Sequence, residues 1–312
     1  MPTLSMPTRD YGLMRQLKTQ NSLGPELKIE FPAFDNILVA ARQMVRELAF
    51  DICEMPITTY LVAKSYGKKF TAIPVFLTRN FHHSAIFVHT QAGINHPKDL
   101  EGKKVGVIRG YTVTTGVWAR GVLSNEYGVD LKKIQWAATD DEHVSEFEAP
   151  PFVDYNFKGQ SIAELFSTGK IVAGVGALPK SIPDVKQVIT NAKEAGFLSY
   201  KKTGIYPVNH TVVVKDELLE KIPHLGKTLF EALKNSKEAY LSSINRNNIK
   251  SDEDRLTIEL EEGLGSDPFP YGIEPNRKAL EALNQTAFDQ LITPEKFSVE
   301  ELFADGTLEL CG

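Results

Sequence analysis

The sequence is poor in several features that mark common classes of protein. Its 312 residues include only two cysteines, Cys53 in a strand-like run and Cys311 beside the C-terminus. Two cysteines so placed do not predict a structural disulfide, and they fit a reducing compartment. Nothing around Cys53 marks it as an activated thiol. No stretch approaches 18 consecutive apolar residues, so we expect no membrane-spanning helix.

Basic charge is also scarce. The net charge is −5, and no run of lysines and arginines stands out, which argues against a nucleic-acid-binding protein. The first eleven residues, MPTLSMPTRDY, lack the basic segment and apolar segment of a secretory signal. We therefore expect a soluble cytoplasmic protein with neither a nucleic-acid partner nor a membrane partner. Whether it forms a homo-oligomer is left open.

Several catalytic signatures are missing as well. The sequence has no G-x-S-x-G, no Walker lysine and no dinucleotide-binding pattern, which argues against common hydrolases and nucleotide-binding enzymes. It also lacks the metal-binding spacings H-x-x-x-H, H-E-x-x-H and H-x-H. A divalent metal held by more scattered side chains stays an open alternative. Its candidate ligands are Glu54, His82, His83, His143 and His210.

The sequence does contain a regular alternation of strand and helix patterns. Hydrophobic residues make up 42% of the chain, enough for the cores of two domains. As far as residue 214, short apolar runs alternate with helical periodicity, which predicts βαβ units and a mostly parallel sheet. Beyond residue 216 the pattern is helical. We expect helices over Leu218–Ser243, Ser251–Glu262 and Glu274–Leu291.

The segment R-N-F-H-H-S, from Arg79 to Ser84, links two strand-like runs, residues 70–77 and 85–89. Such links usually carry Gly, Asn, Asp or Pro, whereas this one carries groups that can exchange protons or bind a carboxylate. His82 and His83 would point in opposite directions if the link were extended. At most one of them is therefore expected to face a ligand cleft unless the link bends. We expect one functional histidine, and the other is a candidate structural histidine.

A second candidate site follows the strand-like run 104–108. A helix is expected to begin there at Thr114 or Thr115, and the N-terminus of a helix attracts anions through its free N–H groups and its dipole. With the neighbouring hydroxyl and guanidinium groups, the turn is suited to a carboxylate. The alternative is that Thr114 only caps the helix. The candidate binding residues are Arg109, Tyr111, Thr112, Thr114 and Thr115.

Three further positions carry reactive groups. Glu54 is expected just after a strand over residues 50–53, at a turn into a helix that contains Thr58 and Thr59; the carboxyl end of a strand is a common ligand site. His143 ends an acidic D-D-E-H run after another strand, and could be a base, a metal ligand or part of a charged surface turn. His210 precedes a returning strand.

These segments resemble the 4,5-dihydroxyphthalate decarboxylase family over most of the chain. The run D-L-x-G-K-x-V-G-V, near residues 99–107, is also typical of type II periplasmic-binding-protein folds. The family pattern has an Asp-Arg pair after its first tyrosine, whereas here Arg9 and Asp10 precede Tyr11, so Arg9 or Arg15 would have to take its place. The strings that carry the resemblance are FDICEMPITTYL, AIPVFLTRNFHHSAIFVH, GINHPKDLEGKKVGV, GYTVTTGVWARGVLSNEYGV, DDEH, GIYPVNH and DPFPYGIEPNRKALEAL.

The resemblance implies an α/β fold of the type II periplasmic-binding-protein kind. Its two lobes would each have a mostly parallel central sheet flanked by helices, with a ligand cleft between them. The first lobe would comprise residues 1–104 and 213–312, and the second residues 105–212. The chain would return to the first lobe near 210–214.

The resemblance also implies an activity, the non-oxidative removal of one carboxylate from 4,5-dihydroxyphthalate to give protocatechuate and CO2. Such a reaction needs an acid for the ring carbon, a base for the phenol and donors for the retained carboxylate, but no required cofactor. We expect His82 or His83 as the acid, and Glu54 or His210 at the phenol hydroxyls. The expected substrate-binding residues are Arg79, Ser84, Arg109, Tyr111, Thr112, Thr114, Thr115, Thr58, Thr59 and His143.

The alternative function is that of a solute-binding protein of a transporter for an aromatic or other small carboxylate. Such a protein would share the ligand cleft and the anion-binding turn. It would not need an acid–base pair, and it would be exported from the cytoplasm.

Overall fold

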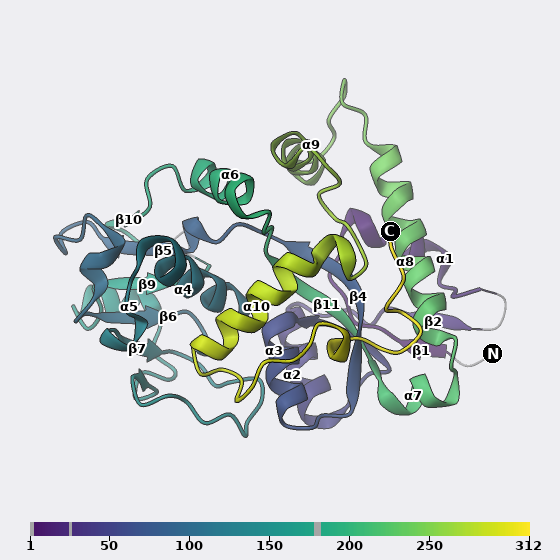
Figure 1. Ribbon diagram of the computed structural model, residues 1–312, viewed down its shortest axis with the longest axis horizontal. Helices are drawn as coiled ribbons and strands as arrows, with labels where there is room; N and C mark the ends of the chain where they lie inside the picture. Colours follow the sequence, from purple (N-terminus) through teal and green to yellow (C-terminus); the bar gives the residue numbers. More distant parts are fainter. Residues whose placement is uncertain (1–2, 25–26, 178–181) are drawn as a thin grey trace. The chain divides into compact units, whose positions relative to one another are not determined.

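The computed structural model describes residues 3–24, 27–177 and 182–312 (Figure 1). The chain divides into two compact units. Unit 1 comprises residues 1–79, 208–281 and 297–312, and unit 2 comprises residues 80–207 and 282–296. The chain therefore passes between the units after residues 79, 207, 281 and 296, and helix α10 (Arg277–Asp289) runs through the third of these passages.

Unit 1 is built on two small sheets. Strands β1 (Thr3–Ser5) and β2 (Lys28–Glu30) pair in parallel. In the second sheet, β11 (Val208–Lys215) lies between β3 (Ile52–Pro56) and β4 (Phe70–Arg79) and is antiparallel to both. Strands β3 and β4 run in the same direction because helix α3 joins them as a crossover. The expected mostly parallel sheet is thus not seen among the described strands of unit 1.

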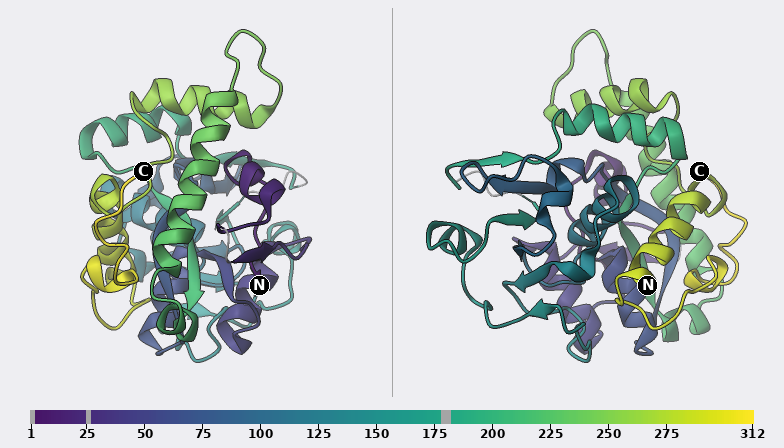
Figure 2. Two further views of the ribbon diagram at one scale, coloured as in Figure 1. Left: turned by 90° about the vertical axis from the view of Figure 1, so that its right-hand side faces the viewer. Right: turned by 60° about the vertical axis from the view of Figure 1, so that its left-hand side comes forward.

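Several helices complete unit 1. Leu229, Phe230 and Leu233 of α8 pack with Ile73 and Val212 of the three-stranded sheet in a buried core, and the left panel of Figure 2 shows α8 running along this sheet. The helices of unit 1 are α1 (Arg15–Gln20), α2 (Ile37–Glu47), α3 (Ile57–Ser65), α7 (Asp216–Lys221), α8 (Leu225–Ser243) and α9 (Asp252–Leu264). Short 3-10 turns lie at Gly12–Met14, Glu274–Asn276 and Glu300–Leu302.

The predicted helix over Leu218–Ser243 is two helices in the structure, α7 and α8. Pro223 explains the break, because a proline disfavours helical backbone in the residue before it. Ile222 accordingly has φ −129° and ψ 78°. The prediction of one continuous helix was therefore wrong at this point.

Unit 2 is built on a mixed six-stranded sheet in the order β10-β5-β9-β6-β7-β8. The pairs β9–β6, β6–β7 and β7–β8 are parallel, whereas β5 is antiparallel to β9 and β10. The strands are β5 (Ile86–His89), β6 (Lys104–Val107), β7 (Gln135–Ala138), β8 (Val153–Asp154), β9 (Ala173–Val175) and β10 (Val185–Gln187). The helices are α4 (Thr114–Tyr127), α5 (Ile162–Ser167) and α6 (Ala192–Thr203), with 3-10 turns at His83–Ala85, Pro97–Leu100 and Leu131–Lys133.

Helix α4 is the element of unit 2 that matters most for the sites. The sequence predicts a helix over Thr114–Tyr127, and the structure confirms it. Gly128 ends the helix with a φ of 64°, a left-handed conformation that glycine adopts without steric cost. Most of α4 is buried, so its residues are fixed by packing.

The segment R-N-F-H-H-S does not join two strands of one sheet. Strand β4 belongs to the sheet of unit 1 and β5 to the sheet of unit 2, so the segment is the first passage between the units. The predicted passages, after residues 104 and 212, lie later in the chain than those of the structure. The first and second passages lie side by side, because Arg79 pairs with Val208 in unit 1 and Asn80 N donates to Pro207 O in unit 2.

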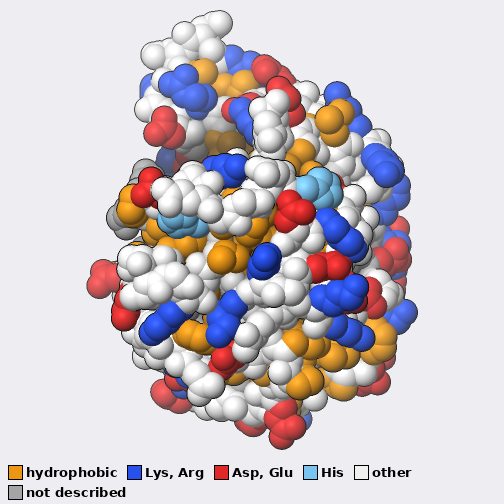
Figure 3. Space-filling model, turned by 90° about the vertical axis from the view of Figure 1, so that its left-hand side faces the viewer, with side chains coloured by type: hydrophobic (Ala, Val, Ile, Leu, Met, Phe, Trp, Pro, Cys, Tyr) orange, Lys and Arg blue, Asp and Glu red, His pale blue; other side chains and the backbone are white. Residues whose placement is uncertain are grey.

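No helix in the described ranges is both long enough and apolar enough to cross a membrane. On the face drawn in Figure 3, lysines and arginines are interspersed with aspartates and glutamates. Mixed charge of this kind does not form the basic stripe typical of a nucleic-acid interface. The two cysteines are both free, Cys53 buried and Cys311 exposed. Burial and the neighbouring charge of Glu54 raise the pKa of the Cys53 thiol, which keeps it neutral.

Candidate functional site

Glu54 lies within β3, where the sequence analysis expected a turn after a shorter strand. All five residues of β3 are buried, and Glu54 has no exposed surface. Glu54 pairs with Val212 of β11, while Pro56 pairs with His210. Glu54 and His210 are thus diagonal neighbours, within reach of one another across the two strands.

The Glu54 carboxylate is surrounded by hydrogen-bond donors. Oε2 accepts from Thr8 Oγ1 and from the backbone N–H of Arg9, each at 2.9 Å. Oε1 contacts Tyr11 OH and His210 Nδ1, each at 2.5 Å. These four donors occupy all of the hydrogen-bonding sites of the carboxylate. Three of these four come from the N-terminal segment, between β1 and α1.

These contacts fix the charge of Glu54. Burial raises its pKa, but the hydrogen bond and the charge of His210, with the donors on Tyr11 and Arg9, outweigh burial and lower the pKa to about 2. Glu54 is therefore ionised at neutral pH and has no lone pair left for a substrate hydroxyl. Burial, the charge of Glu54 and their hydrogen bond raise the pKa of Tyr11, which stays protonated. The predicted role of Glu54 as a group acting directly on a phenol does not fit this geometry.

His210 is the member of the cluster that can exchange a proton. A proton must lie between Nδ1 and Glu54 Oε1, because two acceptors would repel at 2.5 Å, so we assign the Nδ1–H tautomer from the network. Nε2 makes no hydrogen bond with any residue that the structure describes. A histidine oriented by a buried carboxylate is the arrangement of many catalytic acids and bases.

Arg9 adds a cation to this cluster. Its Nε is 3.5 Å from Glu54 Oε1, and its Nη2 is 3.2 Å from His210 Nδ1. Its side chain is 48% exposed, whereas that of His210 is 10% exposed. The guanidinium therefore combines contact with the buried pair and access to solvent, which is what recognition of an anionic ligand requires. Of the two arginines that the sequence offered here, Arg15 instead lies over the ring of Tyr240.

The other predicted residues of unit 1 do not join this cluster directly. Arg79 ends β4 and donates through Nη1 to Asn276 Oδ1 at 2.6 Å. Thr58 and Thr59 are buried in the first turn of α3. Pro56 is at the N-cap position of this helix, and no side chain caps it.

In unit 2, the predicted anion-binding turn holds a carboxylate of the chain itself. Glu142 accepts hydrogen bonds from the backbone N–H of Tyr111, from the N–H and hydroxyl of Thr112, and from Tyr155 OH. The backbone of Gly110 passes so close that a Cβ there would lie 2.6 Å from Glu142 Oε2. The turn thus has the predicted affinity for a carboxylate, and Glu142 of the D-D-E-H run occupies it.

The remaining residues of this turn are arranged around the start of α4. Arg109 has an exposed side chain and a φ of 75°, and its N–H donates to Thr139 Oγ1. Thr114 is buried and is the first residue of α4. The alternative that Thr114 caps the helix was wrong, because Val113 is at the N-cap position and no side chain caps the helix. Thr115 is half-buried.

The sequence analysis missed Arg120, which supports the turn from inside. Arg120 is fully buried and donates to Tyr111 O at 2.5 Å and to Gln290 Oε1 at 2.7 Å. Its guanidinium lies 3.9 Å from the centroid of the Tyr111 ring and 5.5 Å from that of Trp136. Burial lowers the pKa of the Arg120 guanidinium, and the charges of Tyr111 and Glu142 act in the opposite direction. No sequence signal marked Arg120, because it lies inside an ordinary helical pattern.

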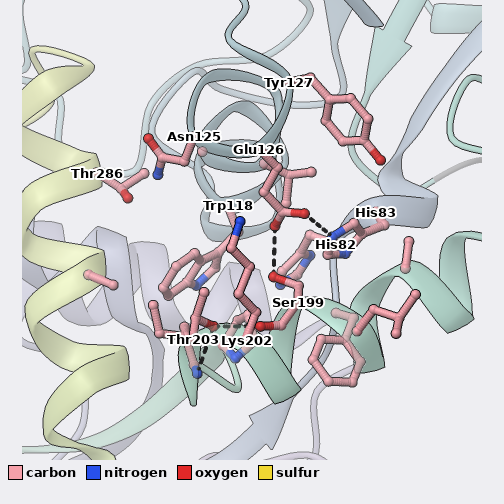
Figure 4. A pocket seen from close by; sticks show the side chains of 18 residues that line it. His82, His83, Trp118, Asn125, Glu126, Tyr127, Ser199, Lys202, Thr203 and Thr286 are labelled. Carbon is pink, nitrogen blue, oxygen red and sulfur yellow. Dashed lines mark hydrogen bonds and ion pairs between the residues drawn. The ribbon is translucent and has the colours of Figure 1, made fainter. Parts of the chain in front are cut away.

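The predicted histidines of the R-N-F-H-H-S segment lie elsewhere in unit 2. His82 has a ψ of 9°, and a 3-10 turn begins at His83, so the segment bends and both histidines are buried beside one cavity of about 480 Å³. His83 Nε2 is 2.9 Å from Glu126 Oε2, as Figure 4 shows. Ser84 is exposed, and His143 is buried next to Glu142.

Two clusters of predicted residues therefore form, one in each unit. In unit 1, Glu54 and His210 meet together with Arg9, and in unit 2 the turn meets the D-D-E-H run. Among the described residues, no group of three or more histidine, cysteine, aspartate and glutamate side chains could hold a metal ion.

Comparison with known proteins agrees with this architecture. Residues 27–243 match the family model described as NMT1/THI5 like. The chain belongs to the NMT1/THI5-like family. It is also 29% identical over 282 residues to a 4,5-dihydroxyphthalate decarboxylase from Comamonas testosteroni, with 85% of each chain covered. The resemblance predicted from the sequence motifs is confirmed.

Solved structures share the fold of this NMT1/THI5-like chain at low sequence identity. The periplasmic aliphatic sulphonate-binding protein SsuA from Escherichia coli is 12% identical with a TM-score of 0.56, covering 98% of this chain and 93% of its own. The desulfurization enzyme DszB is 14% identical with a TM-score of 0.55, covering 99% and 98%. The predicted periplasmic-binding-protein-like α/β fold is confirmed. The fold alone does not decide function, since one of these proteins is a binding protein and the other an enzyme.

The matched part of the NMT1/THI5-like family model contains Glu54, His210 and the turn of unit 2. Thr8, Arg9 and Tyr11 precede it. The donors that bind Glu54 therefore come mostly from outside the matched part.

Proposed function

We propose that this NMT1/THI5-like protein is a non-oxidative decarboxylase of an aromatic dicarboxylate, with 4,5-dihydroxyphthalate as its substrate and protocatechuate and CO2 as its products. The supporting observation is the pair of Glu54 and His210, in which a buried carboxylate 2.5 Å from Nδ1 orients the imidazole. The similarity to a relative named for this reaction supports the choice of substrate.

The proposed chemistry uses His210 as the acid. A hydroxyl para to the departing carboxylate donates electrons to the ring, and the carbon bearing that carboxylate takes a proton from Nε2 of protonated His210. The bond to the carboxylate then breaks, its electron pair restores the aromatic ring, and CO2 leaves. The phenol proton passes to solvent in the first step and is regained from solvent as the ring recovers, and solvent also reprotonates His210.

Glu54 is a positioning residue in this scheme. Its charge holds the Nδ1–H and stabilises the imidazolium that donates the proton. Arg9 supplies a partly exposed guanidinium beside Nδ1, and we assign it to a substrate carboxylate. The binding roles of Arg79, Arg109, Thr114 and Thr115 stay predictions, whereas the N–H and the hydroxyl of Thr112 already donate to Glu142. The earlier prediction that His82 or His83 is the acid stays a prediction, and the geometry favours His210.

A direct assay tests the function. Purified protein is incubated with 4,5-dihydroxyphthalate in D2O, and protocatechuate and CO2 are followed. We expect stoichiometric formation of both, with one deuterium on the ring carbon that lost its carboxylate. His210→Ala should abolish most turnover, while His224→Ala is the matched control, because His224 is an exposed histidine of unit 1.

The same assay addresses the alternative function. A solute-binding protein would bind 4,5-dihydroxyphthalate tightly, release no CO2 and leave the ring undeuterated. That result would remove the decarboxylase proposal. If His210→Ala turned over at the wild-type rate, the protein would still be a decarboxylase, but His210 would not be its acid.

A further inference from the structure

The cavity beside His82 and His83 is lined by residues of unit 2 alone. Its volume of about 480 Å³ is in the range of small-molecule sites. We propose that it is a second ligand site, for a hydroxylated aromatic carboxylate, separate from the catalytic residues. Its walls come from α4, from α6, from the start of unit 2 and from the part of α10 that belongs to unit 2 (Figure 4).

The cavity and the anion-binding turn use different residues. The turn precedes Thr114, whereas the cavity is lined by Trp118, Val122 and Glu126. The lining of the cavity thus extends from one helical turn beyond Thr114 to Glu126, about 18 Å along the helix from Thr114. None of the turn residues 109–115 lines the cavity, so the cavity is a separate feature.

One wall of the cavity is polar. Glu126 accepts from Ser199 Oγ at 2.9 Å, and its other oxygen lies 2.9 Å from His83 Nε2 (Figure 4). Because a carboxylate is an acceptor, Nε2 carries a ring proton, and in the neutral imidazole Nδ1 of His83 is then an acceptor. His83 is only 3% exposed, and its Nδ1 has no hydrogen-bond partner among the described residues. A hydroxyl of the ligand is the donor that this atom lacks.

The other polar feature is a cation. Lys202 lines the cavity and forms no ion pair with any described residue, and the carboxylate of Glu126 is already bound by two donors. The aromatic side chains of Phe81 and Trp118 supply flat apolar surface. Apolar walls, one cation and one buried acceptor together favour a flat ring that carries both a carboxylate and a hydroxyl.

The position of the cavity suggests why its occupancy matters. Phe81 to His83 directly follow the first passage between the units, Pro207 precedes the second, and Ala282 begins the third. A molecule bound here contacts the unit 2 end of three connecting segments at once. The cavity therefore adjoins three of the four connecting segments on their unit 2 side.

The two tryptophans of the chain offer a specific readout. Trp118 lines the cavity, whereas Trp136 is fully buried in β7. We would titrate 3,4-dihydroxybenzoate, benzoate and benzylamine into the full chain and follow tryptophan fluorescence. We expect saturable quenching by 3,4-dihydroxybenzoate, weaker binding of benzoate and none of benzylamine. The quenching should be lost in Trp118→Phe, which also corrects for absorption by the ligand.

Two neighbouring lysines of α6 provide a matched pair of variants. Lys202→Met should weaken 3,4-dihydroxybenzoate binding about tenfold or more, since it removes a charge-assisted contact. Lys201→Met removes the same charge from an exposed residue that does not line the cavity, and should leave the affinity unchanged. Both residues are exposed, so neither variant should disturb folding.

Several results would overturn the proposal. These are the absence of saturable quenching, equal affinities of the two lysine variants, or a preference for benzylamine over benzoate. The inference does not depend on the proposed function, and His210→Ala separates the two. Quenching that persists in His210→Ala supports a separate site, whether or not the protein decarboxylates anything. Quenching that disappears with His210 would mean that the signal comes from the catalytic site.

Discussion

Each unit of the protein buries one glutamate within a ring of donors. Glu54 in unit 1 and Glu142 in unit 2 each accept from backbone N–H, a threonine hydroxyl and a tyrosine hydroxyl. The carboxylate of Glu142 holds the backbone turn at Tyr111 and Thr112 in place. Glu54 has His210 as its fourth partner, so it also fixes which ring nitrogen of His210 carries the proton.

The comparison therefore predicts that equivalent substitutions have different consequences. Changing Glu54 should chiefly affect turnover, and changing Glu142 should chiefly affect stability. The distinction would be wrong if substitutions of Glu54 and Glu142 changed turnover and stability to the same extent.

The largest effect is expected for Glu54→Gln. The amide keeps the shape of the side chain but loses the charge that holds the Nδ1–H of His210. We expect kcat for decarboxylation to fall about 10³-fold. Glu142→Gln is the matched control, with a much smaller fall in kcat. Equal losses in the two variants would contradict the assignment of His210 as the acid.

The next effect is on stability. Glu142→Ala leaves the backbone N–H groups of Tyr111 and Thr112 buried without their acceptor. We expect the free energy of unfolding to fall by about 3 kcal/mol, measured by urea denaturation. Asp141→Ala removes the adjacent exposed carboxylate, paired with Lys158, and should cost less than about 1 kcal/mol. Comparable losses would show that Glu142 is not held as described.

Acid should weaken the Glu54 cluster in a defined direction. Its pKa is lowered from 4.5 in the unfolded chain to about 2 in the folded protein, so its stabilising contribution is complete above pH 4.5 and is lost as the pH falls towards 2. This contribution is about 3 kcal/mol. Urea denaturation at pH 4.5 and at lower pH should therefore show a steeper loss of stability in the wild type than in Glu54→Gln. Parallel curves would contradict the lowered pKa.

The smallest effect concerns the fit around Glu142. In Gly110→Ala the new methyl group would lie 2.6 Å from Glu142 Oε2, so we expect a loss of about 2 kcal/mol in the free energy of unfolding. The same substitution in the Glu142→Ala background should cost much less, because the clashing carboxylate is gone. If Gly110→Ala lowered the free energy of unfolding equally in both backgrounds, the loss would come from the backbone at residue 110 and not from the clash with Glu142.

The sequence was most informative where function depends on local pattern. Helix α4 and the carboxylate affinity of the turn before it were predictable, because a strand followed by a threonine-rich helix start has few alternative conformations. The occupant of the turn was not predictable, since Glu142 lies 30 residues beyond Thr112 and reaches it only through the pairing of β6 with β7.

The other differences have the same origin in long-range contacts. Glu54 looked like a turn residue because a glutamate is rarely fully buried, and only the donors from residues 8–11 make its burial tolerable. Arg120 and Glu126 stand among ordinary helical residues, and their partners come from distant segments. The meeting of Glu54 with His210 required the register of β3 against β11, which no single segment encodes.

The origin of the Glu54 donors has a consequence for sorting related proteins. The family match begins at residue 27, whereas Thr8, Arg9 and Tyr11 belong to the first dozen residues. Two relatives can thus share the whole matched segment and still differ in whether their buried glutamate is supplied with these donors. The first dozen residues, which precede the family match, are the ones to inspect when deciding which relatives share this chemistry. For the same reason, a shortened version of this chain that starts at residue 13 would keep β3 and His210 yet lose the environment that gives them their proposed role.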